Sequence, residues 1–247
     1  IRGKKIIMIT GKTTDSFKKS SVHFPCLVPN MKGFETALKL GVKEISLFSA
    51  TSSEFTQKNI NATVEESFVR MEEIAKAAKE NSIRIRAYIS TAFGCPYAGE
   101  MSSKDLINVV EEFLSLGVYE ISIGDTIGVA TPWDVRTVVE RVRMEAPDVY
   151  LRLHFHDTRG AGLANVAAAV DAGVDVIDAS CGGIGGCSFA PAATGNVATE
   201  VVVYMLERAG FETGLDLGKL IETAKWLETA LGHPVSSSLS KAGGFPA

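Results

Sequence analysis

Long apolar runs, a strong charge of either sign and abundant cysteine are all missing from this 247-residue sequence. No apolar run reaches the roughly 18–20 residues that a membrane span needs, so no membrane partner is expected. Lysine and arginine number 25 against 29 for aspartate and glutamate, and no basic run is present, which argues against nucleic acid as a partner. Four dispersed cysteines are too few for a disulfide framework. They favour a reducing compartment, the cytoplasm, or the mitochondrial matrix in a eukaryote.

Short apolar segments alternate with helical patterns from about residue 24, and this alternation predicts a parallel sheet built from βαβ units. The expected strands cover Phe24–Val28, Glu44–Phe48, Ile83–Ile89, Tyr119–Ile123, Tyr150–Phe155 and Val174–Ala179. The expected helices cover Met31–Leu40, Val64–Asn81, Lys104–Leu116, Pro132–Met144, Gly162–Ala172, Val197–Gly210 and Leu217–Leu231.

The returns from helix to strand repeat one pattern, a helix end, a glycine cap and a short entry into the next strand, at Gly41, Gly117 and Gly173. This repetition favours an α/β fold of the (β/α)8 TIM-barrel type over a dinucleotide-binding sheet, whose glycine fingerprint is absent. No Gly-x-x-x-x-Gly-Lys-Ser/Thr occurs, so nucleotide hydrolysis has no support. About six of eight βα units are recognisable. We therefore predict an incomplete barrel over residues 22–247, loosely ordered after His233, preceded by an atypical segment 1–21.

His154 and His156 stand one residue apart at the end of a predicted strand and supply half of the four histidines in the chain. Residues i and i+2 of a strand point to the same face, so both imidazoles face one space. Neutral imidazole is the commonest metal ligand in proteins, and a same-face pair forms half of a metal site. Taken alone, the pair also fits two partly exposed polar residues.

Polar residues gather at the C-terminal ends of the other predicted strands, where a (β/α) barrel places its chemistry. Asp125 ends one strand, and it either acts on a substrate or starts a turn. Cys187 lies in a glycine-rich loop after the last strand, although a lone cysteine is more often a small buried hydrophobe. Asn196 would equally serve as the N-cap of the following helix. Glu200 either orients a metal-binding or reacting group or is a first-turn acid favoured by the helix dipole.

Several segments together resemble the 3-hydroxy-3-methylglutaryl-CoA (HMG-CoA) lyases, within a wider group of metal-dependent barrel lyases and aldolases that includes isopropylmalate and homocitrate synthases. Gly-Asp-Thr-Ile-Gly and His-x-His-Asp-Thr are shared across the wider group, whereas Gly-Cys-Pro-Tyr and Gly-Gly-Cys point more narrowly to the lyases. The matching segments, in family order, are Val28–Glu35, Lys58–Asn61, Gly94–Tyr97, Glu120–Val129, Leu153–Thr158, Gly185–Cys187 and Gly195–Glu200.

The resemblance implies a reaction and a role for each candidate residue. A divalent cation, Mg²⁺ or Mn²⁺, would be bound by His154, His156 and the side-chain oxygen of Asn196, and would act as a Lewis acid. The reaction would be a retro-Claisen cleavage of HMG-CoA to acetoacetate and acetyl-CoA. Cys187 would protonate the acetyl-CoA enolate, Asp125 would be a second acid or base or would orient the substrate, and His154 would also count as catalytic. The expected ligand is therefore an acyl-CoA, and a homodimer is the assembly to test for.

Two features depart from the family pattern. The Arg-Asp pair that ends the first family strand, and a Glu of the second, have no counterpart in residues 1–21, so one metal-binding carboxylate is missing. The loop continues after Cys187 with Ser188-Phe189 where Pro-Tyr is common. Two alternatives therefore stay open: an aldolase or Claisen-type synthase of the same group, and a truncated chain without activity.

Overall fold

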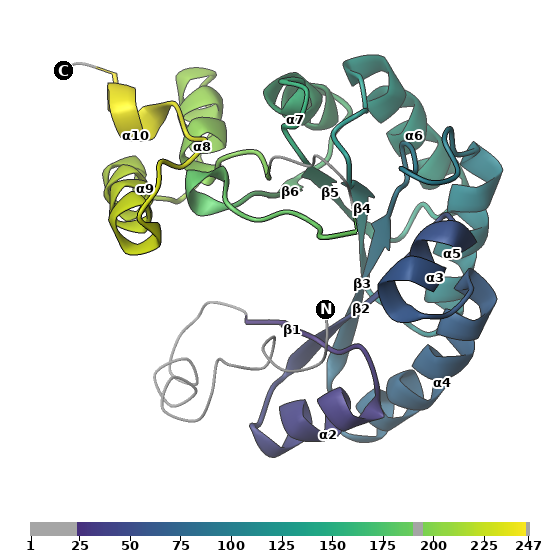
Figure 1. The fold of residues 1–247 in the computed structure, drawn as a ribbon. Coiled ribbons are helices and arrows are strands. Elements are labelled where there is room, and N and C mark those ends of the chain that lie inside the picture. Colours follow the sequence, from purple (N-terminus) through teal and green to yellow (C-terminus); the bar gives the residue numbers. More distant parts are fainter. Residues whose placement is uncertain (1–23, 190–194, 246–247) are drawn as a thin grey trace. The chain divides into compact units, whose positions relative to one another are not determined.

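The computed structural model describes residues 24–189 and 195–245, so the predicted atypical segment 1–21 lies outside the described residues (Figure 1). The strands are β1 Cys26–Leu27, β2 Glu44–Ala50, β3 Arg84–Ser90, β4 Glu120–Asp125, β5 Tyr150–Phe155 and β6 Val176–Asp178. They form one sheet in the order β1-β2-β3-β4-β5-β6, with parallel pairing from β1 to β4. Each strand thus lies beside its neighbour in the sequence, as in a (β/α) barrel, and the predicted incomplete TIM barrel is confirmed.

Helices follow most of the strands, and every predicted helix is present with its ends shifted by no more than two residues. The helices are α2 Met31–Lys39, α3 Ser53–Ile60, α4 Val64–Glu80, α5 Ser103–Ser115, α6 Pro132–Glu145, α7 Gly162–Asp171, the 3-10 turn η1 Cys181–Gly183, α8 Thr199–Arg208, α9 Leu217–Leu231 and α10 Leu239–Ala242. Within the described ranges, none of these helices has the length and apolar character needed to cross a bilayer.

The chain divides into two compact units. The first unit extends to Gly124 and adds Glu140–Arg152, and the second holds Asp125–Val139 together with the chain from Leu153 onward. In the first unit, one face of the strands is apolar and buried, with Ile45 and Leu47 on β2 and Ile121 and Ile123 on β4. The other face is polar.

Two helices were not predicted, and one of them corrects the expected tail. As far as the structure describes it, to residue 245, the tail after His233 is not loosely ordered, because it forms α10 and buries Ser237, Leu239 and Ser240. The serines that suggested disorder make local hydrogen bonds instead, such as the one from the Ser240 backbone N–H to the Ser237 hydroxyl at 3.4 Å. The helix α3 escaped notice because its sequence is largely polar, with Phe55 as its main buried apolar residue.

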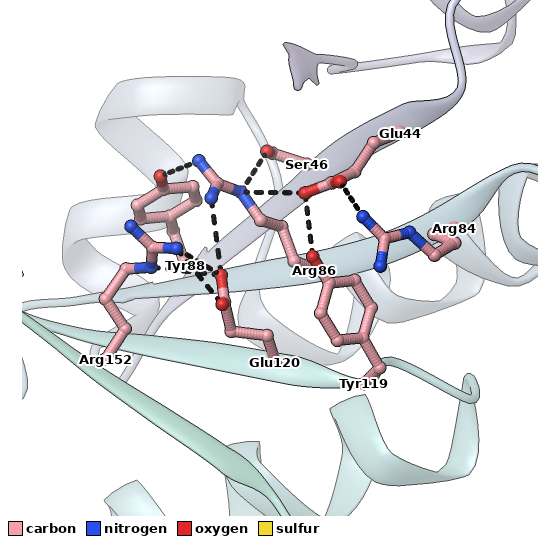
Figure 2. Close-up of polar contacts among 8 residues, drawn as sticks. All are labelled: Glu44, Ser46, Arg84, Arg86, Tyr88, Tyr119, Glu120 and Arg152. Atoms are coloured by element: carbon pink, nitrogen blue, oxygen red, sulfur yellow. Dashed lines mark hydrogen bonds and ion pairs between the residues drawn. The ribbon is translucent and has the colours of Figure 1, made fainter. Parts of the chain in front are cut away.

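The polar face of the first unit carries a network of ion pairs (Figure 2). Glu120 on β4 accepts hydrogen bonds from Arg152 Nε and Nη2, both at 3.0 Å, and from Arg86 Nη1 at 3.3 Å. Glu44 on β2 accepts from Arg84 at 2.6 Å and from the Tyr119 hydroxyl at 2.8 Å. Burial and the Glu44 carboxylate raise the pKa of Tyr119 to about 12, so this hydroxyl stays protonated and keeps donating.

Candidate functional site

The end of strand β5, which belongs to the second unit, places the two histidines of the predicted metal site. The side chains of Leu153 and Phe155 are fully buried on one face, so strand alternation puts His154 and His156 together on the other. The two imidazole rings lie edge to face, with centroids 5.2 Å apart and an interplanar angle of 65°. Both ring systems therefore border the same small volume, as the spacing predicts.

Asn196 lies beside these histidines because its segment pairs with the end of β5. The Val197 N–H donates to the Phe155 carbonyl, and the Asp157 N–H donates to the Gly195 carbonyl, both at 3.1 Å. This places Asn196 opposite His156 in an antiparallel bridge. The alternative role as N-cap is wrong, since α8 begins at Thr199 with Ala198 as its cap.

Two buried atoms at this site lack hydrogen-bond partners. They are His156 Nδ1 and Asn196 Oδ1, and the one other such side-chain atom among the described residues is Asn165 Oδ1. The Asn196 amide nitrogen donates to the Ile184 carbonyl at 2.8 Å, which fixes the side chain and leaves its oxygen available. Buried polar atoms normally have partners, so an unpartnered nitrogen and an unpartnered oxygen on facing segments suit a cation that is bound there.

The histidines are held in the neutral form that metal binding requires. Burial lowers the pKa of His154, an effect that the Asp178 carboxylate and the Asn196 side chain partly offset. Burial and the neighbouring His154 ring lower the pKa of His156 to about 4. Two neutral imidazoles and one amide oxygen fit a divalent cation. Among the described residues, no group of three or more His, Cys, Asp or Glu side chains adds a carboxylate to this set.

The lowered pKa of His156 predicts acid instability. The unfolded chain takes up a proton near pH 6.5, whereas the folded chain resists it down to about pH 4. The histidine therefore stabilises the fold fully above pH 6.5, and this contribution is lost as the pH falls from about 6.5 to 4, by up to about 3 kcal/mol. Urea unfolding of the parent protein and of His156→Gln across this range should show a shallower decline for the variant. Parallel curves would contradict the prediction.

Asp125 closes β4, and its carboxylate is engaged by the turn that follows. The carboxylate accepts hydrogen bonds from the backbone N–H groups of Val129 at 2.9 Å and Ala130 at 3.0 Å. Asp125 is only 1% exposed. Burial raises the pKa of Asp125, against the opposing effect of these N–H donors and of Arg159. The Asp125 backbone carbonyl also accepts the His156 N–H at 3.3 Å. The carboxylate thus starts a turn, as one reading predicts, and its catalytic role stays a prediction.

The loop that carries Cys187, which the structure describes from Gly182 to Phe189, packs on Asn196. A Cβ on Gly185 would lie 2.8 Å from the Asn196 amide nitrogen, so the loop leaves no space for a side chain at that point. Cys187 follows two residues later and is half-buried. The first residue of the loop, Gly182, is held by the fully buried Glu200. The Gly182 N–H donates to both carboxylate oxygens of Glu200, each at 3.1 Å.

The similarity to known proteins is extensive. A model of the protein family described as HMGL-like matches residues 9–227. The human mitochondrial hydroxymethylglutaryl-CoA lyase is 46% identical over 225 residues, which cover 91% of this chain and 69% of the human protein. The chain belongs to the HMGL-like family.

Solved structures of HMGL-like proteins agree. The crystal structure of hydroxymethylglutaryl-CoA lyase from Pseudomonas aeruginosa matches with a TM-score of 0.88 and 40% identity, covering 94% of this chain and 79% of that one. The structure of an HMG-CoA lyase from Acinetobacter baumannii, in complex with coenzyme A and 3-methylmalate, matches with a TM-score of 0.86 and 36% identity, covering 95% and 79%. The resemblance and the carbon–carbon lyase class predicted from the sequence are confirmed.

Membership of the HMGL-like family, whose HMG-CoA lyases generally depend on a divalent metal, leaves the individual residue roles as predictions. The structure brings together His154, His156 and Asn196. Sequence reasoning missed the hold of Glu200 on the loop, for which the only signal was its position in the first turn of a helix. It also missed Ser236, whose hydroxyl reaches the same loop from the tail of the chain and which no sequence pattern distinguishes from its serine neighbours.

Proposed function

We propose that this chain is a divalent-metal-dependent lyase that cleaves HMG-CoA to acetoacetate and acetyl-CoA. The observation that carries the proposal is the pair of unpartnered buried atoms, His156 Nδ1 and Asn196 Oδ1, on residues that oppose each other in a β-bridge. They occur in a chain that is 46% identical to a protein named as a hydroxymethylglutaryl-CoA lyase. The A. baumannii relative bound to coenzyme A supports an acyl-CoA as the substrate class.

His154, His156 and Asn196 would hold the cation in this proposal. When bound, the cation supplies a Lewis acid that polarises the hydroxyl and acyl oxygens of the substrate. The two nitrogen ligands favour Mn²⁺ over the harder Mg²⁺. Burial lowers the pKa of both imidazoles, that of His156 to about 4, so protons compete less for these nitrogens.

The proton transfers are assigned to Asp125 and Cys187. Cleavage removes the proton of the tertiary hydroxyl, breaks the adjacent C–C bond and leaves acetoacetate and the enolate of acetyl-CoA. Burial raises the pKa of Asp125, against the opposing backbone N–H donors and Arg159, and in this proposal its carboxylate accepts the hydroxyl proton. The Cys187 thiol would then return a proton to the enolate carbon, because its loop begins beside Asn196 and can present it to the same site.

Assembly and location belong to the same proposal. A homodimer is proposed for the assembly, and the cytoplasm, or the mitochondrial matrix in a eukaryotic source, for the location. The human relative is named as mitochondrial.

The test is an HMG-CoA cleavage assay on the full chain, with the metal removed and then added back. We expect cleavage that EDTA removes and Mn²⁺ restores, and Cys187→Ser should lower kcat by about 100-fold or more without changing Mn²⁺ affinity. Chromatography of acetoacetate and acetyl-CoA, with a panel of other 3-hydroxyacyl-CoA and 2-oxo acid substrates, separates a lyase from an aldolase or synthase. A chain with neither tight Mn²⁺ binding nor turnover would instead support the inactive alternative.

A further inference from the structure

The start of the Cys187 loop is contacted by a segment more than fifty residues away, Val235 and Ser236, which we call the tail clamp. The Ser236 hydroxyl lies 3.2 Å from the Gly182 carbonyl oxygen and 3.3 Å from that of Gly183, so it donates to these two acceptors. Both glycines belong to η1, the short turn from which the loop departs.

The tail clamp fits tightly against these glycines. A Cβ on Gly182 would lie 3.1 Å from the Val235 side chain, and a Cβ on Gly183 would overlap the Ser236 hydroxyl. Both glycines also have left-handed backbone, with φ of 69° and 66°. The contact thus requires glycine at 182 and 183, and it places the small Ser236 side chain directly against them.

The tail clamp is itself anchored. Val235 is 4% exposed, and its N–H donates to the Glu228 carboxylate of α9 at 3.1 Å. The Ser240 hydroxyl donates to the same carboxylate oxygen at 3.3 Å. Gly182 is therefore fixed at its carbonyl by the clamp and at its N–H by Glu200.

Beyond these bonds, the loop borders open space. A cavity of about 520 Å³ is lined on one side by Gly183, Ile184 and Gly185, and on the other by Leu231 and residues 233–236. Because Gly183, Ile184 and Gly185 line this cavity, the bonds at the start of the loop do much to determine its path.

We propose that Ser236 is a positioning residue that sets the path of the loop carrying Cys187. The proposal rests on the role of Cys187 given above. Ser236 touches no reacting atom: it fixes two consecutive carbonyls four to five residues before the thiol. Removing its hydroxyl frees the loop to sample other paths, which changes the exposure of the thiol and reduces the fraction of molecules in which it faces the site.

The test measures thiol reactivity, which needs no turnover. In Ser236→Ala we expect iodoacetamide to alkylate Cys187 about fivefold faster than in the parent, since one hydrogen bond is worth about a factor of five. Ser236→Thr keeps the hydroxyl and should restore the parent rate. Ser238→Ala removes an exposed serine hydroxyl two residues away and should stay within about twofold of the parent rate. Peptide mass spectrometry follows each cysteine separately.

Buried Cys95, 3% exposed, reports any general loosening of the fold. Faster alkylation of Cys187 alone, with rescue by threonine, supports the proposal. An unchanged Cys187 rate, or an equal rise at Cys95, would overturn it. In a chain that cleaves HMG-CoA, Ser236→Ala should also lower kcat several-fold with little change in KM. In a chain that does not, the proposed function fails while the alkylation rates still decide the role of Ser236.

Discussion

Alanine in place of His156 is expected to lower Mn²⁺ affinity at least about 100-fold and to remove metal-dependent cleavage. Loss of a residue that merely supports a metal ligand already costs about 10- to 100-fold, so loss of a ligand should cost at least the upper end of that range. His154→Ala should behave in the same way, because the centroids of the two rings lie only 5.2 Å apart and both rings border the same space. Isothermal titration with Mn²⁺ measures the affinity directly, independently of substrate.

The chain offers a matched control in His233. Its ring is exposed, and its Nδ1 lies 2.9 Å from the neighbouring Pro234 carbonyl. His233→Ala should therefore keep the Mn²⁺ affinity of the parent. If His156→Ala kept it too, while circular dichroism showed an intact fold, the cation would have to bind elsewhere and the assignment of this site would fail.

The fold could be predicted from the sequence because its signals are local. Apolar strands alternate with helices, and glycines at Gly41, Gly117 and Gly173, all with positive φ, end the helices as expected. The polar α3 gave no such periodicity and was missed. The tail was misjudged because serine-rich sequence suggests disorder, whereas Ser237 is buried beside α10.

The candidate site could be predicted only in part. The spacing of His154 and His156 already placed both rings on one face of a strand. The role of Asn196 depended on where the next helix begins, and sequence patterns locate helix ends poorly. The structure starts α8 at Thr199, which removes Asn196 from the cap and pairs it with His156. The tail clamp could not be predicted, because it joins distant segments through a single hydroxyl.

The ion pairs of the first unit were also hidden from the sequence, since they depend on strand register. Arg86 and Glu120 are 34 residues apart in the chain but directly opposed on β3 and β4. Arg152 adds a two-pronged contact to the same carboxylate. The side chains of Glu120, Arg86 and Arg152 are 10%, 13% and 17% exposed, so these charges are largely removed from water and depend on one another (Figure 2).

Replacing Glu120 with glutamine is therefore expected to destabilise the protein by about 3–5 kcal/mol, the usual cost of removing one member of a buried ion pair. Arg86 and Arg152 lose their shared carboxylate, and the glutamine amide presents a donor to groups that can only donate. Arg86 keeps its contact with Glu44 Oε1 at 3.9 Å. Urea unfolding followed by circular dichroism at 25 °C measures the change. The double variant Glu120→Gln with Arg152→Gln should cost less than the sum of the single variants, because the second change removes one of the two charges that share this carboxylate.

Glu145→Gln supplies the comparison for the same chemical change at the surface. Glu145 pairs with Arg141 on α6 at 3.2 Å, but their side chains are 37% and 48% exposed, so the loss should stay below about 0.5 kcal/mol. Equal, small losses in both variants would show that water screens Glu120 as well, and the network would then be a surface feature. A large loss at Glu120 alone would mean that the pairing of β3 with β4 depends on buried charge as well as on the apolar face of the strands.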